Sequence, residues 1–331
     1  MNQDPSSQDV NQSVEAGACI WACRQSLKYA AGVLDCMETP VRSAGGPDLS
    51  ESEFPGQSDR TQFIDDLRTG PARSGAAAVI LADRRFDPTM SIQGEPRLCS
   101  LEPLERPMGV NQTVIQIGAF IRSAGFKAAQ QILDDFGPIT SLHITAHSGA
   151  GQGSLYSRLY DAVTTVLAVL GGPDMIDAML VGPVSAGTPE GARPHGDQLP
   201  EGLSQLTGDL GALIRCQPRG LATISASDQA CWDRSVRVLG PSGTVCIDQV
   251  GVSWTDPSGR VIEEQPLERD RFQNACRQAA AEIDHWWSGQ SDPLREPDAG
   301  LAIATCEATR LSCRTREPES TEKVRELLAR T

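Results

Sequence analysis

The chain has 331 residues, 39% of them hydrophobic, which is enough for two domains with sizeable cores. Its 29 basic and 43 acidic side chains give a net charge of -14, which repels nucleic-acid phosphates and anionic membrane surfaces. No apolar stretch approaches the roughly 20 residues that span a bilayer, and the polar start of the chain carries no export signal. We therefore expect a cytoplasmic protein without nucleic-acid or membrane partners.

The ten cysteines are scattered along the chain, and none forms a Cys-x-x-Cys pair. In a reducing compartment such residues act mostly as small buried hydrophobic side chains. We expect a structural role for most of them.

The first 82 residues predict an N-terminal tail followed by a parallel sheet. Residues 1–13 are polar and predict a disordered tail. Residues 14–37 are apolar and fit either a strand and a helix or one helix. Residues 39–60 predict a loop, 63–68 a short helix, and 76–82 a buried strand, because an unbroken apolar run suits a parallel strand covered on both faces.

The next segment predicts an irregular stretch over residues 83–107, followed by two helices. Asn111 can cap the first helix, on which Val114, Ile117 and Ile121 share a face. The second helix spans residues 127–136 and closes at Gly137-Pro138.

A strand, a turn, a helix and a strand come next. Residues 139–147 alternate like a strand, residues 148–153 form a glycine-rich turn, and leucine and valine recur at helical spacing over residues 155–170. Residues 175–181 predict another strand.

Residues 205–265 predict an antiparallel meander. Apolar and polar residues alternate in its first strand, so one face must be covered by helices elsewhere. Three turn signals separate its strands: Pro218-Arg219-Gly220, Pro241-Ser242-Gly243 and Pro257-Ser258-Gly259. Two amphipathic helices, residues 269–287 and 298–313, and a charged, solvated tail over 316–331 complete the chain.

Several short segments match a known family of proteins. They are Gly208-Asp209, residues 238–245, Asp292-Pro293 with Pro297-Asp298-Ala299, residues 63–67 and residues 78–82. These segments resemble the Gfo/Idh/MocA family of oxidoreductases, mainly from residue 125 to residue 314. The resemblance implies a truncated Rossmann-like parallel-sheet domain over 14–123 and an α+β domain with a large open, mostly antiparallel sheet over 124–315.

The sequence departs from this family at the cofactor turn. A dinucleotide site needs a glycine-rich turn between the first strand and helix, so that backbone amides can approach the pyrophosphate. No GxGxxG occurs in the first third of the chain. We therefore expect no cofactor, or NAD or NADP if the protein is an active oxidoreductase.

The family's catalytic positions are also altered. Where the family has Glu-Lys-Pro, this chain has Glu105-Arg106-Pro107, with a competing alignment at Leu101-Glu102-Pro103. By resemblance, Glu105 and Pro107 are the cofactor-binding candidates, and Arg106, which stays charged at ordinary pH, can hold an oxyanion but not trade protons. Tyr160 stands near the place of the family histidine, and Asp161 matches its aspartate. The catalytic candidates are therefore Arg106, Tyr160 and Asp161, and the alternative is that Tyr160 packs in the core and Asp161 bonds a neighbouring loop.

Two further patterns predict weaker sites. His143 and His147 share a strand face but lack a third metal ligand nearby, so we expect no metal. Gly149, Gly151 and Gly153 precede a helix, where amides can meet an anion, although a tight turn explains them as well.

Three functions fit these observations. The first is a non-catalytic binding or oligomeric relative of the family; a homodimer through the open sheet is a separate prediction. The second is an NAD(P)-dependent sugar or polyol dehydrogenase with an unusual site. The third is a sugar-binding protein in which Arg106, Arg158 and Asp161 grip hydroxyls or phosphate without chemistry.

Overall fold

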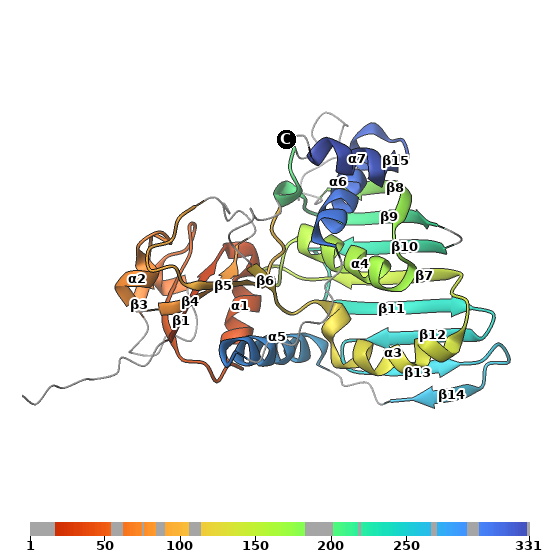
Figure 1. The fold of residues 1–331 in the computed structure, drawn as a ribbon, viewed down its shortest axis with the longest axis horizontal. Coiled ribbons are helices and arrows are strands. Elements are labelled where there is room, and N and C mark those ends of the chain that lie inside the picture. Colours follow the sequence, from red (N-terminus) through yellow and green to blue (C-terminus); the bar gives the residue numbers. More distant parts are fainter. Residues whose placement is uncertain are drawn as a thin grey trace, which may run out of the picture.

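The chain folds around two β-sheets that lie next to each other (Figure 1). The computed structural model describes residues 17–53, 62–74, 76–83, 90–105, 114–182, 201–217, 220–265, 270–289 and 298–329. Sheet A has six strands in the order β3-β2-β1-β4-β5-β6, and sheet B has nine in the order β14-β13-β12-β11-β7-β10-β9-β8-β15.

Sheet A is parallel throughout, and its central strands are buried on both faces. Alternate residues of β1 and β4 enter two separate hydrophobic clusters, one of which also contains helices α1 (Leu27–Leu34) and α5 (Arg271–Trp287). The strands are β1 (Gly17–Ala22), β2 (Val41–Gly45), β3 (Gln62–Ile64), β4 (Ala76–Ala82), β5 (Arg97–Ser100) and β6 (Val114–Gln116). The buried strand predicted over residues 76–82 is confirmed, and the described residues 17–37 contain a strand, β1, and a helix, α1, rather than one helix.

Four expectations in this region were wrong. Strand β2 lies in the predicted loop, β3 replaces the helix expected over residues 63–68, and β5 lies in the stretch expected to be irregular. Where Asn111 was expected to start a helix, the chain forms β6 and the short 3-10 helix η3 (Phe120–Arg122), and Asn111 itself lies outside the described residues. The strands β2, β3, β5 and β6 have only three to five residues, which is too few to show a clear alternation of apolar and polar residues. They form because parallel neighbouring strands supply their hydrogen bonds, and this tertiary context overrides local propensity.

Sheet B is mixed, because β7 (Ser141–His147) lies between β10 and β11. It is parallel to β10 and antiparallel to β11. The remaining strands are β8 (Pro173–Val181), β9 (Asp209–Cys216), β10 (Gly220–Ser227), β11 (Asp233–Gly240), β12 (Gly243–Asp248), β13 (Val252–Thr255), β14 (Val261–Glu264) and β15 (Glu319–Ser320).

The predicted meander is therefore confirmed in two parts, the β9–β10 hairpin and the β11–β14 run. The prediction was wrong between β10 and β11, because β7 lies between these two strands. Alternation predicts which face of a sheet a residue occupies, but not which strand lies beside it. The expected apolar face is buried at Leu206, Leu210, Ala212, Ile214 and Cys216.

Helices cover one face of sheet B (Figure 1). They are α3 (Ala124–Phe136), α4 (Leu155–Leu170) and α6 (Ala299–Thr315), which begin after the capping side chains of Ser123, Ser154 and Asp298. The segment expected to be a solvated tail contains β15 and α7 (Thr321–Leu328), which pack on β8 and α6, and Val324 is buried there.

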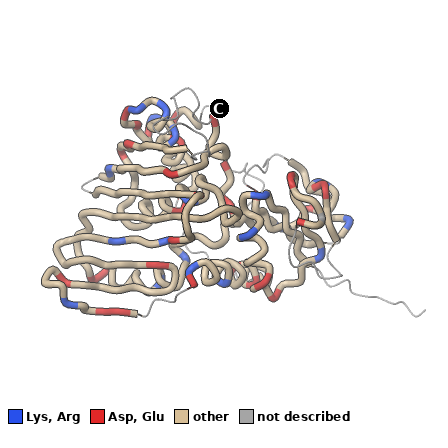
Figure 2. The backbone as a smooth tube through the Cα atoms, turned by 180° about the vertical axis from the view of Figure 1, so that it is seen from behind, with Lys and Arg blue, Asp and Glu red and all other residues tan. Residues whose placement is uncertain are grey.

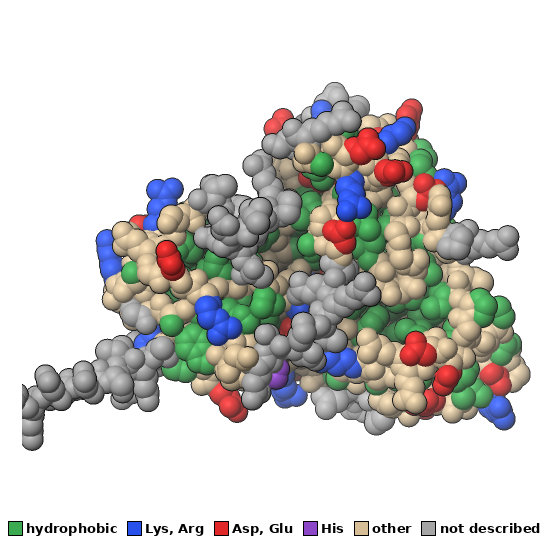
Figure 3. Space-filling view, viewed as in Figure 1, with side chains coloured by type: hydrophobic (Ala, Val, Ile, Leu, Met, Phe, Trp, Pro, Cys, Tyr) green, Lys and Arg blue, Asp and Glu red, His purple; other side chains and the backbone are tan. Residues whose placement is uncertain are grey.

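No helix of the described residues lies over the opposite face of sheet B (Figure 2). Large apolar side chains are exposed on its strands β8, β9 and β10, namely Met179, Val181, Leu213 and Leu221. On the helix-covered side, acidic and basic side chains are interspersed (Figure 3). No described helix is long and apolar enough to cross a membrane.

Candidate functional site

The candidate site lies where the start of α4 meets the segment that leaves sheet A after β5. Glu102 in this segment is fully buried, and the Ser154 hydroxyl donates a 2.9 Å hydrogen bond to its Oε2. Two residues further along the helix, the Tyr156 hydroxyl donates to the Leu104 carbonyl oxygen at 2.8 Å. The N-terminus of α4 is thereby joined to sheet A.

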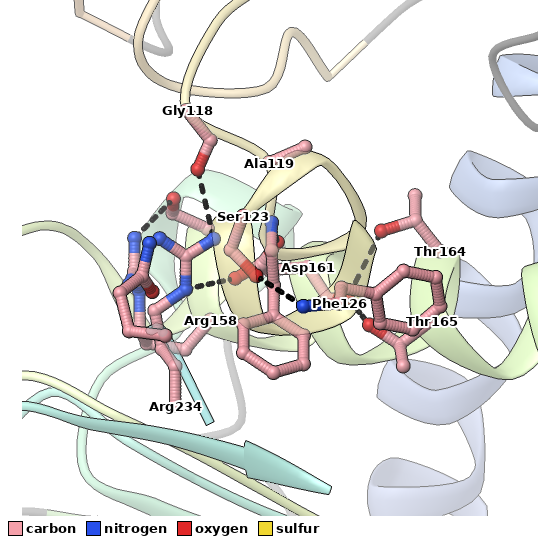
Figure 4. A network of polar contacts seen from close by, with 12 residues as sticks. Gly118, Ala119, Ser123, Phe126, Arg158, Asp161, Thr164, Thr165 and Arg234 are labelled. Atoms are coloured by element: carbon pink, nitrogen blue, oxygen red, sulfur yellow. Dashed lines mark hydrogen bonds and ion pairs between the residues drawn. The ribbon is translucent and has the colours of Figure 1, made fainter. Parts of the chain in front are cut away.

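A buried ion pair connects α4 to sheet B. Arg234 Nε lies 2.6 Å from Asp161 Oδ2, and both side chains are at least nine-tenths buried (Figure 4). Arg234 Nη2 also donates to the Gly118 carbonyl oxygen at 2.8 Å, and the Phe120 N–H donates to Asp161 Oδ1 at 2.8 Å. The segment between β6 and α3 is therefore held by both members of the pair.

Arg158, one turn before Asp161, is a second buried guanidinium. It is 3% exposed, and its Nη2 donates to Ser157 Oγ at 3.0 Å. Burial, followed by the charge of Arg234, lowers the pKa of Arg158. Among the described residues, its Nε and Nη1 have no hydrogen-bond partner. The Asp161 and Glu102 carboxylates act on this pKa in the opposite direction, so the buried guanidinium lies near two negative charges.

Three aromatic rings pack beside the two arginines. Trp232 lies 5.5 Å from Tyr29 and 5.1 Å from Phe272, measured between ring centroids. The Arg158 guanidinium carbon lies 4.6 Å from the Trp232 ring, and that of Arg234 lies 5.6 Å from it. Burial raises the pKa of Tyr29, so its hydroxyl is neutral at physiological pH.

A pocket of about 450 Å³ lies beside this cluster, and Trp232 and Phe272 line it. It is formed by the starts of α1 and α5, the glycine-rich turn after β7, and the turn between β10 and β11. The lining residues are Lys28, Gly149, Gln152, Ala230, Cys231, Trp232, Asp270, Arg271 and Phe272.

The glycine-rich turn is hydrogen-bonded to the turn between β1 and α1. The Tyr29 N–H, in the first turn of α1, donates to the Gly151 carbonyl oxygen at 3.0 Å. The Gly153 N–H donates to the Gln25 carbonyl oxygen, also at 3.0 Å. The Gly149 N–H donates to Gln152 Oε1 at 2.9 Å. The amides of Gly149 and Gly153 are thus already hydrogen-bonded within the chain, and a tight turn explains these glycines.

The described residues around this turn do not fit a dinucleotide. The N–H groups at the start of the first helix normally meet the pyrophosphate, but that of Tyr29 is taken by Gly151. The residues between β1 and α1, Cys23 to Ser26, include no glycine that would let a phosphate approach the backbone. Asp48 follows β2, near the position where dinucleotide-binding folds place the acidic residue that binds ribose. Its Oδ1 accepts a 3.2 Å hydrogen bond from the Arg24 N–H, so this carboxylate stabilises the turn between β1 and α1.

None of the described candidates Glu105, Tyr160 and Asp161 lines the pocket. Arg106 and Pro107 lie outside the described residues, and Glu105 is half-buried. Tyr160 is buried in the core of sheet B, 6.0 Å from the Tyr156 ring, and Asp161 bonds Arg234 and the Phe120 N–H. These contacts agree with the alternative in which Tyr160 packs and Asp161 bonds a neighbouring segment.

The two strand histidines lie on the uncovered face of sheet B. His143 Nδ1 is 2.6 Å from Thr223 Oγ1, and His147 Nε2 is 2.9 Å from Ser225 Oγ. No group of three His, Cys, Asp or Glu side chains within the described ranges could hold a metal ion.

Sequence reasoning missed Trp232 and Arg234. One signal was available for Arg234: it occupies the same face of β11 as the buried Val236 and Val238. A charged residue on the apolar face of an alternating strand must have a buried partner, and here the partner is Asp161.

The two sheets define a class of protein with a parallel Rossmann-type sheet followed by an open mixed sheet covered by helices on one side. No family model matches the sequence, and no curated protein matches it. Solved structures share the fold over nearly the whole chain.

Three of these structures are oxidoreductases. Scyllo-inositol dehydrogenase from Lactobacillus casei with bound NAD(H) and scyllo-inositol matches at 14% identity and a TM-score of 0.64, over 93% of this chain and 99% of that one. Levoglucosan dehydrogenase in complex with NADH and L-sorbose matches at 14% identity and 0.60, over 92% and 98%. An oxidoreductase domain protein from Kribbella flavida matches at 11% identity and 0.65, over 92% and 99%. The fold expected from the resemblance is thus confirmed.

Proposed function

We propose that this protein is a non-redox, small-molecule-binding relative of the sugar and polyol dehydrogenases whose fold it shares. The hydrogen bond from the Tyr29 N–H to the Gly151 carbonyl oxygen carries this proposal, because it uses the amide that a dinucleotide pyrophosphate would need. The ligand pocket is the one lined by Lys28, Gln152 and Trp232.

The chemistry of the buried residues supports binding rather than hydride transfer. Asp161 is held in an ion pair with Arg234, and Tyr160 packs in a hydrophobic core. A general acid or base must reach the proton it moves, and neither side chain lines the pocket. Arg158 and Lys28 offer donors and positive charge, which suit recognition of a polar molecule.

Titration with NADH and NADPH tests the proposal directly. Nicotinamide fluorescence and thermal shift should show no saturable binding up to millimolar cofactor, because a ligand of the native state must raise its stability. Saturable binding with a rise in melting temperature would refute the non-redox proposal and support the alternative, a sugar or polyol dehydrogenase with an atypical site. The L. casei enzyme, which binds NAD(H), serves as the positive control.

We also propose that two copies associate through the uncovered face of sheet B. Met179 is 70% exposed on β8, and it lies diagonally from Leu213 on β9, which is diagonal to Leu221 on β10. These three exposed apolar side chains form a diagonal row across the sheet, which suits a self-complementary interface. The ten cysteines, all free and seven of them buried, support placement in the reducing cytoplasm.

A further inference from the structure

We propose that two copies of this chain pack face to face around a two-fold axis along β10, and that Asp177 of each copy forms an ion pair with the partner's Arg237. This inference rests on the proposed association through sheet B. It adds the register of the two sheets and the charges that select the partner.

One row of side chains crosses five adjacent strands of the uncovered face. Its members are direct Cα partners from strand to strand, and we call them the Thr223 row: Asp177 on β8, Leu213 on β9, Thr223 on β10, His143 on β7 and Arg237 on β11. Directly paired residues point to the same side of a sheet, and here four of the five are exposed while Thr223 is half-buried. The row therefore has an acidic end, a basic end and Thr223 at its centre.

The charges at the two ends of the Thr223 row have no counter-charge in the described part of the chain. Neither Asp177 nor Arg237 forms an ion pair with a described residue, whereas Arg215, on the same face of β9, pairs with Asp174 at 2.9 Å. Exposed charges that become buried on association need an opposite charge on the partner. A second copy of this chain can supply both charges.

A two-fold axis that runs along β10, between two facing sheets, exchanges the strands on its two sides. β9 of one copy then lies over β7 of the other, and β8 lies over β11, because these strands are the first and second neighbours of β10 (Figure 1). The rotation keeps each residue's position along the strands. Asp177 therefore faces the partner's Arg237, Leu213 faces the partner's His143, and each contact occurs twice.

The neighbouring rows of the face fit the same axis. Leu221 lies on β10 itself, so the axis brings the two copies of this exposed leucine together. Asp209 on β9 and His147 on β7 are both direct partners of Ser227 on β10, so Asp209 faces the partner's His147. An apolar residue thus meets its own copy, and an acidic residue meets an imidazole.

The adjacent strands are poorer positions for the axis. An axis along β7 places His143 against the partner's His143 and Arg237 against the partner's Thr223. An axis along β9 places Asp177 against the partner's Thr223. Only the axis along β10 gives both unpaired charges of the Thr223 row an opposite charge.

Two charge reversals and their mixture test this pairing. Asp177→Arg sets a positive charge against the partner's Arg237, and Arg237→Asp sets a negative charge against the partner's Asp177. Each variant alone, shown to be folded by circular dichroism, should dimerise about tenfold more weakly than the native chain. An equimolar mixture of the two should restore the dimer, because both cross-pairs of the mixed dimer join an acid to a base. Sedimentation velocity of the full chains over a concentration series at neutral pH measures each affinity.

Arg215→Asp is the matched control for the mixture. It reverses a charge on the same face, at a residue that pairs with Asp174 in its own chain. Mixing Arg215→Asp with Asp177→Arg leaves one like-charged pair across the interface, so the mixture should not recover the native affinity.

The mixture also separates this inference from a folding defect, because a damaged fold is not rescued by mixing. The inference is overturned if the native chain dimerises and neither reversal weakens the dimer, or if the mixture of Asp177→Arg and Arg237→Asp stays dissociated. Association through sheet B then stands with another register. A native chain that is monomeric at micromolar concentration overturns both the register and the association. The non-redox proposal is tested separately, by titration with NADH and NADPH.

Discussion

The carbonyl oxygen of Gly151 accepts a 3.0 Å hydrogen bond from the N–H of Tyr29, and it thereby joins the turn before α4 to the first turn of α1. In a nucleotide-binding fold of this type, the start of the first helix is the natural place for an anion. Here the neutral carbonyl of Gly151, in the connection between β7 and α4, already accepts the hydrogen bond of one N–H group at the start of α1. Lys28, the residue before Tyr29, lines the pocket.

Gly153→Ala should destabilise the protein by about 1–3 kcal/mol, because Gly153 has φ +122 and an added Cβ would press on Glu102 and Arg158. The free energy of unfolding from urea denaturation measures the loss. Gly172→Ala is the matched control, since no atom lies within 4 Å of the new methyl group, and it should change little. Equal losses in both variants would show that the turn tolerates a side chain.

Asp161→Asn should cost about 3–5 kcal/mol of stability, because it leaves the Arg234 charge buried without its counter-charge 2.6 Å away. Arg325→Gln breaks the exposed pair with Asp298 and should cost no more than about 1 kcal/mol. Both values come from urea denaturation at neutral pH. A loss at Asp161 as small as that at Arg325 would mean that the buried pair contributes nothing to folding.

Stability should fall as the pH rises above about 9. Burial raises the pKa of the thiols of Cys19 and Cys276 from about 9 to about 12, so the folded state keeps protons that the unfolded state has lost. The stabilisation is complete below pH 9 and is lost as the pH approaches 12, at up to about 1.4 kcal/mol per pH unit for each thiol. Unfolding free energies at pH 8, 9 and 10 measure the slope.

The double variant Cys19→Ala/Cys276→Ala isolates the thiol contribution. Its slope between pH 9 and pH 10 should be shallower than that of the native chain, whatever its stability at pH 8. An unchanged slope would assign the alkaline loss to other groups.

Leu213→Asp should convert a dimer into a monomer, because it places a charge within the diagonal row of exposed apolar side chains on sheet B, next to Met179. Light scattering coupled to size exclusion at micromolar concentration gives the mass. Leu327→Asp, at an exposed leucine on α7, is the control and should leave the dimer intact. A native chain that is monomeric at this concentration would contradict the proposed association.

Features that depend on local pattern could be predicted from the amino-acid sequence. The apolar run of β4, the alternation of β9 and the helices α3, α4 and α6 were all predictable, because hydrophobic period and turn residues act over a few neighbouring positions. The two-sheet fold followed from phrases that resemble a known family.

Only the tertiary structure decided which segments meet. The insertion of β7 between β10 and β11, the short strands β2, β3, β5 and β6, and the contact between Gly151 and Tyr29 depend on partners far away in the chain. The site follows the same rule, because Arg158, Trp232 and Arg234 come from different elements and converge only when α4 packs on sheet B. Burial then gives these groups their properties, since desolvation and unmet hydrogen bonds exist only in the folded chain.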